Sequence, residues 1–107
     1  MARALRFSTQ LGGAPSGPEW IARVRFLEAS GYDAVLMPDH VIGGSLSPLV
    51  ALASAAVATT TVRLGTLVID NDFRNPLMIA REVATLDVLS AGRFEFGIGA
   101  GWAIRDN

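Results

Sequence analysis

The stretch VRLGTLVIDNDFRNPLMIAREVATLDVLSAGRFEFGI, residues 62–98, contains a complete strand–helix–strand repeat. Branched and aromatic residues predict strands over 62–69 and 93–98. The segment 75–92 between them begins with Asn-Pro, ends at a glycine, and carries apolar residues at helical spacing. A strand, a helix and a second strand in this order are typical of a parallel sheet.

The same unit recurs toward the N-terminus. Strands are predicted over 4–9 and 33–37, and the four strand segments begin at residues 4, 33, 62 and 93. A helix over 16–31 is indicated by a Ser-x-x-Glu capping box with a proline in its first turn. A second helix over 47–59 begins with Ser-Pro. Starts about 30 residues apart are too widely spaced for hairpins, so we expect four consecutive βα units.

Four such units fit either a doubly wound open sheet or part of a (β/α)₈ barrel. A complete barrel needs about 250 residues, and this chain has 107. We therefore predict an α/β fold corresponding to half of a barrel, a single partial domain over 1–107 that ends after its fourth strand. The helix over 47–59 is apolar nearly all round, so we expect a partner surface to cover more than one of its sides.

Composition excludes several classes of function. The chain has no cysteine and one histidine, so no disulfide or metal site is expected. A formal net charge of -1 gives no basic surface for nucleic acid. The chain lacks both a signal peptide and the run of roughly 18 apolar residues that a membrane span needs, so we expect a cytoplasmic protein without membrane partners.

Ligands of parallel α/β folds bind where the strands end. The residues that follow the four predicted strands are Gln10, Asp39–His40, Asp70–Asp72 and Gly99–Trp102. A histidine at this position can transfer a proton or hold a hydrogen bond to a reacting group. The alternative is that Asp39 caps a turn and His40 lies on the surface.

Glycines at 97, 99 and 101 remove side chains where the fourth strand ends, which lets a planar ring or a phosphate approach the backbone. The alternative is a tight turn with no ligand. Their spacing is not that of a dinucleotide fingerprint, and residues 10–15 lack the Lys-Ser/Thr of a phosphate loop, so a nucleotide-binding module ranks last. Arg74 could assist an anion at the helix that Asn75 caps, or be a solvated loop arginine.

The motifs GYDAVLMPDH at 31–40 and RLGTLVIDNDFRNPLMIAREVATLDVLSAGRFEFGIGAGW at 63–102 together resemble the luciferase-like monooxygenase superfamily. The resemblance covers nearly the whole chain and looks closest to the branch that uses coenzyme F420. It implies the N-terminal half of a (β/α)₈ TIM barrel, and a flavin-type ring at the carboxyl ends of the strands. The cofactor would be F420, or alternatively FMN.

The resemblance also implies roles for individual residues. His40 would relay a proton or orient the substrate, and Asp39 would contact the cofactor or fix the imidazole. A non-proline cis peptide is expected at Leu67–Val68. The predicted cofactor-binding set is Gln10, Asp39, His40, Leu67, Val68, Asp70, Asn71, Gly101 and Trp102. Some deazaflavin enzymes have a catalytic glutamate after the fourth strand and a tryptophan soon after the histidine; here Trp102 and residues 41–45 stand at those places.

Two functions follow as hypotheses. The first is a flavin- or deazaflavin-dependent oxidoreductase or monooxygenase that transfers hydride to a small organic substrate, or oxygenates it. The second is a noncatalytic half-barrel that associates with itself, as a homo-oligomer, or with a complementary half, because its outer strands have unpaired edges.

Overall fold

The computed structural model describes residues 4–101, in which parallel strands alternate with helices. The elements in chain order are β1 Ser8–Gln10, α1 Gly17–Ala29, β2 Ala34–Met37, α2 Pro48–Ala58, β3 Arg63–Thr66, β4 Ile69–Asp70, the 3₁₀ helix η1 Asn71–Phe73, α3 Pro76–Leu89, β5 Phe94–Glu95 and β6 Ile98–Gly99. Among these residues no helix is long and apolar enough to cross a membrane.

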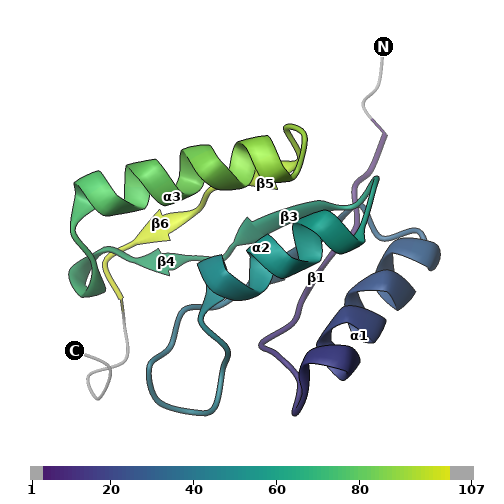
Figure 1. Ribbon diagram of the computed structural model, residues 1–107, viewed down its shortest axis with the longest axis horizontal. Helices are drawn as coiled ribbons and strands as arrows, with labels where there is room; N and C mark the ends of the chain where they lie inside the picture. Colours follow the sequence, from purple (N-terminus) through teal and green to yellow (C-terminus); the bar gives the residue numbers. More distant parts are fainter. Residues whose placement is uncertain (1–3, 102–107) are drawn as a thin grey trace.

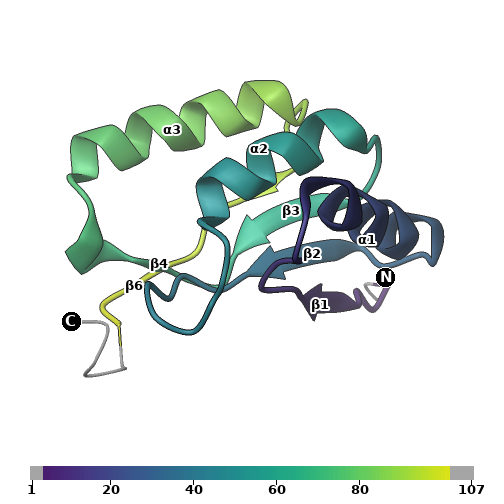
Figure 2. The same ribbon diagram turned by 60° about the horizontal axis from the view of Figure 1, so that its bottom comes forward.

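The strands form a four-stranded parallel sheet in the order β1-β2-β3-β5, and β4 and β6 continue it as a second parallel pair. Each strand of the main sheet thus lies beside its predecessor in the chain, as in a barrel wall. All three helices cover one face of the sheet, and the other face is open (Figures 1 and 2). The prediction of a parallel α/β fold is confirmed.

The third and fourth predicted strands were expected to be continuous, and each is interrupted. β3 is separated from β4 by Leu67 and Val68, and β5 from β6 by Phe96 and Gly97. At the interruption Thr66 replaces the regular ladder: its hydroxyl donates to the Gly97 carbonyl at 2.8 Å and accepts from the Gly97 N–H at 2.9 Å. The β3–β4 segment and the β5–β6 segment are therefore interrupted at the same place, and these backbone groups stay paired.

The first strand was predicted over residues 4–9 but begins only at Ser8. Just before it, the Phe7 carbonyl accepts from the Asp33 N–H at 2.9 Å, while the Phe7 N–H donates to the Asp33 carboxylate at 2.7 Å. A side chain thus takes the place of a backbone acceptor, so the regular pairing starts one residue later.

The predicted helix starts are all present, with different caps. The Ser16 hydroxyl accepts from the Glu19 N–H at 3.2 Å, and the Asn75 side chain accepts from the Leu77 N–H at 2.8 Å. Ser47 makes no side-chain cap, although Pro48 starts α2 as expected. The helices end at Ala29, Ala58 and Leu89, close to the predicted ends.

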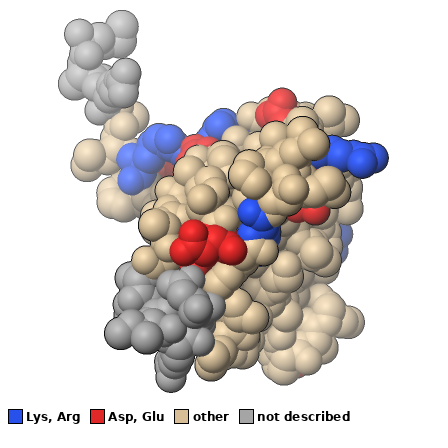
Figure 3. All heavy atoms as spheres, turned by 90° about the vertical axis from the view of Figure 1, so that its left-hand side faces the viewer, with Lys and Arg blue, Asp and Glu red and all other residues tan. Residues whose placement is uncertain are grey.

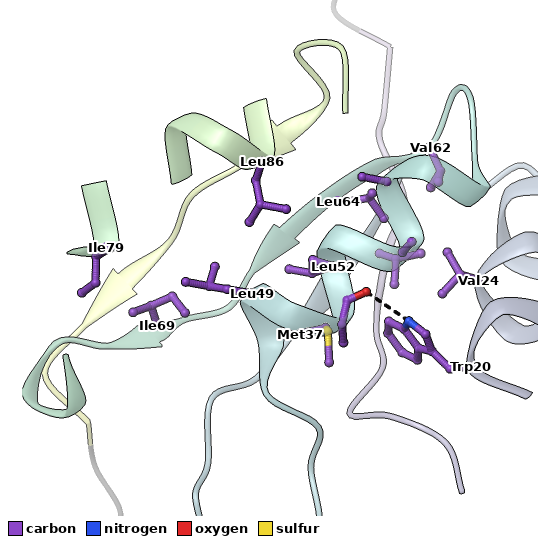
Figure 4. Packing of buried hydrophobic residues seen from close by; sticks show 14 residues of the cluster. Trp20, Val24, Met37, Leu49, Leu52, Val62, Leu64, Ile69, Ile79 and Leu86 are labelled. Carbon is purple, nitrogen blue, oxygen red and sulfur yellow. Dashed lines mark hydrogen bonds between the residues drawn. The ribbon is translucent and has the colours of Figure 1, made fainter. Parts of the chain in front are cut away.

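The core lies between the helices and the sheet (Figure 4). Trp20 is 3% exposed, and its indole N–H donates to the Ala51 carbonyl of α2 at 3.1 Å. Phe26, in the same helix, is 68% exposed. The packing of α1 therefore centres on Trp20 and Val24, one turn apart.

The neighbouring elements bury most of α2 against the sheet. Its buried residues are Pro48, Leu49, Ala51, Leu52, Ala55 and Ala56. Val50 and Val57 stay more than 70% exposed. An additional partner surface is therefore needed only for the outer side of α2, where these two valines lie.

The open face of the sheet carries charge. Side chains alternate along a strand, so Arg63 and Glu95 lie opposite the core residues Leu64 and Phe94. Glu95 accepts from both Arg6 and Arg63 at 2.5 Å. Burial would raise the pKa of Glu95, but these two guanidinium groups hold it below its ordinary value.

Two charged side chains, those of Arg93 and Glu28, form hydrogen bonds with the turn between α2 and β3. Arg93 donates to the carbonyls of Ala56, Thr59, Val62 and Ser90 and to the Thr59 hydroxyl, at 2.7 to 3.2 Å. Glu28, at the end of α1, accepts from the backbone N–H groups of Thr60, Thr61 and Val62 at 2.8 to 3.0 Å. Both satisfy backbone groups at the turn between α2 and β3.

We predict that Glu28→Gln lowers the free energy of unfolding by about 1 to 2 kcal/mol near neutral pH. Burial would raise the pKa of Glu28, but the three N–H donors lower it from 4.5 to about 2. The ionised carboxylate therefore stabilises the fold fully above pH 4.5, and its contribution is lost as the pH falls toward 2.

Urea titrations from pH 7 to pH 2 measure this. The difference between wild type and Glu28→Gln shrinks on acidification, whereas Glu19→Gln, whose carboxylate is 3.8 Å from Arg23 on the surface of α1, has little effect at any pH. A pH-independent difference would contradict the assignment.

Candidate functional site

The carboxyl ends of β2, β4 and β6 surround a hollow of about 360 Å³, which we call the strand-end hollow. It is lined by Asp39, His40, Leu67, Val68, Asp70, Gly99, Ala100 and Gly101. The lining is mostly apolar, with a few polar groups converging on it, as is usual for sites that hold small organic molecules of roughly this size. The ends of β4 and β6, which border it, lie at the left of Figure 1.

The peptide between Leu67 and Val68 is cis, as the resemblance implied. The Leu67 carbonyl accepts from the Gln10 side-chain amide at 3.3 Å, so Gln10 supports this segment from β1. Both apolar side chains are partly exposed and line the hollow. They supply an apolar surface between the polar ends of β2 and β6.

The glycines of the fourth strand are required by close approach to this segment. A Cβ at Gly97 would lie 2.4 Å from the Thr66 carbonyl oxygen, and one at Gly99 would lie 2.6 Å from a methyl group of Val68. The group that approaches Gly97 and Gly99 is thus the neighbouring strand segment, and the approach of a ring or a phosphate stays a prediction. Beyond them the described residues Ala100 and Gly101 contribute no large side chain to the lining.

A buried ion pair stands at the opposite wall. The Asp39 carboxylate, 6% exposed, accepts from two guanidinium nitrogens of Arg74, and one of its oxygens also accepts from the Asp70 N–H at 2.8 Å. The Asp70 carboxylate accepts from the Asp72 N–H at 3.0 Å and thereby caps η1. Asp39 is thus a buried acceptor that joins the ends of β2 and β4, and not a surface turn cap.

His40 lies between two hollows. Together with Asp39 it lines the strand-end hollow and also a second hollow of about 290 Å³, bordered by residues 45–47, Phe73 and Arg74. The imidazole is half-buried and follows directly on the fixed carboxylate. This position suits a group that passes a proton to or from a bound molecule.

Most of the predicted site residues come together. Asp39, His40, Leu67, Val68, Asp70 and Gly101 line the strand-end hollow. Gln10 reaches it through the Leu67 carbonyl, and Asn71, at the start of η1, is outside its lining. Trp102 lies outside the described residues.

Sequence reasoning underestimated Arg74, which was left as an anion-binding or solvated loop residue. Its side chain is 21% exposed and fully committed to Asp39 as a two-nitrogen donor. The signal that points to it is the presence of opposite charges after consecutive predicted strands, Asp39 after 33–37 and Arg74 after 62–69.

Few charged side chains lie on the described surface at this end of the molecule. Figure 3 faces it and shows mostly uncharged surface with isolated acidic and basic groups. Within residues 4–101 no three His, Asp or Glu side chains are grouped as metal ligands. A larger groove of about 570 Å³ runs between α2 and α3. It is away from the strand ends, apart from sharing Arg74, so we place the site at the smaller hollow.

Comparison with known proteins identifies a family and relatives that match most of this chain. A profile of the family described as luciferase-like monooxygenase matches residues 4–106. The 4-hydroxyprotoasukamycin monooxygenase of Streptomyces nodosus subsp. asukaensis is 34% identical over 85% of this chain and 26% of its own. The F420-dependent glucose-6-phosphate dehydrogenase of Rhodococcus erythropolis is 31% identical over 99% of this chain and 34% of its own.

Solved structures show the same fold. The coenzyme F420 dependent tetrahydromethanopterin reductase of Methanopyrus kandleri superposes with a TM-score of 0.83 at 28% identity, over 94% of this chain and 28% of the reductase. The oxygenating constituent of 3,6-diketocamphane monooxygenase from Pseudomonas putida, in complex with FMN, gives 0.86 at 18% identity, over 97% and 32%, and supports the fold alone. The chain thus spans about a third or less of the relatives described, as the fold prediction of a partial barrel requires.

We predict that Gly97→Ala lowers the free energy of unfolding by about 2 kcal/mol or more, because the new methyl group would press on the Thr66 carbonyl. Gly17→Ala is the matched control, since a Cβ there meets nothing within 4 Å. Urea denaturation of both variants measures the difference. Equal free energies of unfolding for the two variants would show that the β3–β4 and β5–β6 segments can move apart without loss of stability.

Proposed function

Because the chain belongs to the luciferase-like monooxygenase family, we propose that its strand-end hollow binds the ring of a flavin-type cofactor in an oxidoreductase. Coenzyme F420 is the cofactor we put first, and FMN is the alternative. Relatives described as F420-dependent support this order, and a neighbour in complex with FMN supports the alternative. Because the chain spans only part of these proteins, activity, substrate and a cytoplasmic location are proposed for the protein as a whole.

The single observation that carries the proposal is the composition of the hollow. A flat, electron-poor ring needs an apolar surface to lie on, room at the backbone, and a few polar groups at its edge. Leu67 and Val68 give the apolar surface, Gly99 to Gly101 leave the mouth open, and Asp70 stands at the edge. The residues present therefore fit such a ring.

The side chains of this chain then have distinct tasks. The bound ring supplies the hydride or the oxygen chemistry, which amino acids do not provide. His40, between the two hollows, holds or moves the proton that accompanies the reaction of a small organic substrate. Asp39 fixes the backbone of the His40 wall through its hydrogen bonds to Arg74 and Asp70.

We predict that the purified chain binds F420 and FMN saturably, with the site at the strand-end hollow. Ala100→Phe, which fills the exposed mouth, weakens binding by about tenfold or more. Ala29→Phe, an exposed position at the far end of α1, leaves binding unchanged. Titration followed by cofactor fluorescence measures all three.

The same titration locates the ring. Within residues 4–101 no arginine lines the strand-end hollow, and Arg74, which borders the second hollow, is paired with Asp39. The phosphate of FMN should therefore add little, and riboflavin should bind this chain within about threefold of FMN. Failure of wild type to bind any of these compounds would overturn the proposal for this chain.

The second candidate function is a noncatalytic partial barrel that pairs with itself or with a complementary half. One observation favours it: the face of the sheet opposite the helices is uncovered, and β1 and β5 each have one strand neighbour. Exposed edges of this kind recruit further strands.

If the chain pairs with itself, we expect its molar mass by light scattering to be twice the 11.3 kDa of one chain. Pairing through strand edges predicts that the dimer persists at high salt, because backbone hydrogen bonds are less sensitive to screening than surface charges. A stable monomer across the concentrations used for the titrations would rule out self-pairing. The ring-binding proposal would be unaffected.

A further inference from the structure

We propose that Arg74 is a positioning residue of the strand-end hollow: it fixes the Asp39 carboxylate and neutralises its charge beside the place where a reduced ring would bind. The consequence for the ring rests on the function proposed above. The positioning itself concerns only residues of this chain and can be tested without a cofactor.

The geometry is that of a clamp between two loops. Arg74 follows η1 and Asp39 follows β2, 35 residues earlier in the chain. One guanidinium nitrogen donates to each carboxylate oxygen, and the Asp70 N–H makes a further hydrogen bond to the same carboxylate. A planar two-nitrogen donor holds a carboxylate in one orientation, which a lysine cannot do.

Burial makes this clamp necessary. The Asp39 side chain is 6% exposed and the Arg74 side chain 21% exposed. A carboxylate at that depth is costly unless it is paired, and removal of one partner leaves an uncompensated charge. The other charged groups nearby are Asp70 and Asp72, both acidic. No second cation borders either hollow within residues 4–101, so without Arg74 the charge on Asp39 would be unopposed.

An unopposed charge would matter at this wall in particular. Asp39 and His40 are consecutive and line both hollows, so a carboxylate that turned toward solvent would move the backbone that carries the imidazole. Oxidised FMN has a neutral ring, whereas reduced FMN is electron-rich and loses a ring proton near neutral pH. A free carboxylate would therefore repel reduced FMN more strongly than oxidised FMN.

The first test uses His40 itself, which is the only histidine of the chain and so gives a single set of imidazole NMR signals. Arg74→Met should shift or broaden these signals in the cofactor-free protein. Arg81→Met, which removes an exposed arginine from α3, should leave them in place. Unchanged signals in a folded Arg74→Met protein would overturn the positioning role.

The second test compares the two oxidation states. Arg74→Met should weaken binding of reduced FMN by about tenfold and that of oxidised FMN by about threefold or less. Arg74→Lys, which keeps the charge, should restore the preference between the two states but not the His40 signals. Equal losses for both states would overturn the charge-neutralising role.

A double variant separates this role from folding. Asp39→Asn combined with Arg74→Met removes both charges, so it should fold even if Arg74→Met alone does not, and should bind the two oxidation states with the wild-type ratio. A double variant as biased against the reduced form as Arg74→Met would contradict the proposal. If wild type binds no cofactor, the proposed function fails, while the His40 signals still decide whether Arg74 positions this wall.

Discussion

The parallel pairing of β2 with β3 is the constraint on which the site depends. It places Met37 beside Thr66, so the chain leaves both strands at the same edge of the sheet. Asp39 and Asp70 then meet across that edge as a carboxylate and a backbone N–H 2.8 Å apart. Without this register, residues that lie about 30 positions apart in sequence would have no reason to converge. The hollow is thus a result of topology first and of side chains second.

Arginine side chains make many of the hydrogen bonds and ion pairs around this sheet. All nine basic residues of the chain are arginines, and two of them satisfy several acceptors at once. Arg93 joins the turn after α2 to the start of β5, and Arg74 joins two loops at the opposite end of the sheet, where the strands end. A lysine at either place has one nitrogen and no fixed plane, so it could not reach all the acceptors of Arg93 or hold both Asp39 oxygens in one plane. The same residue type therefore serves stability at one end and the site at the other.

The fold was predictable because its signals are local. Proline after Ser47 and Asn75, and glycine after α1 and α3, mark boundaries whatever the tertiary structure. The strand interruptions were not predictable from residue types, because Leu67 and Val68 are good strand residues, and the break arises from the hydrogen bonds of Thr66 with Gly97. The burial of Trp20 and the exposure of Phe26 also depend on where α2 packs. For the site, residue types at strand ends located the hollow, whereas the partner of Asp39 required the pairing of β2 with β3, which continues into β4.

The separation of tasks within the hollow follows from its charges. The described residues offer an apolar surface at Leu67–Val68, an open backbone at Gly99 to Gly101, and the imidazole of His40. Arg74, which borders the second hollow, already neutralises Asp39, and the other described charged groups at the strand ends, Asp70 and Asp72, are acidic. A hollow of this composition suits the ring of the proposed cofactor better than an anionic tail. Recognition of the ring and recognition of the tail are therefore physically separable, and residues 4–101 are equipped for the first.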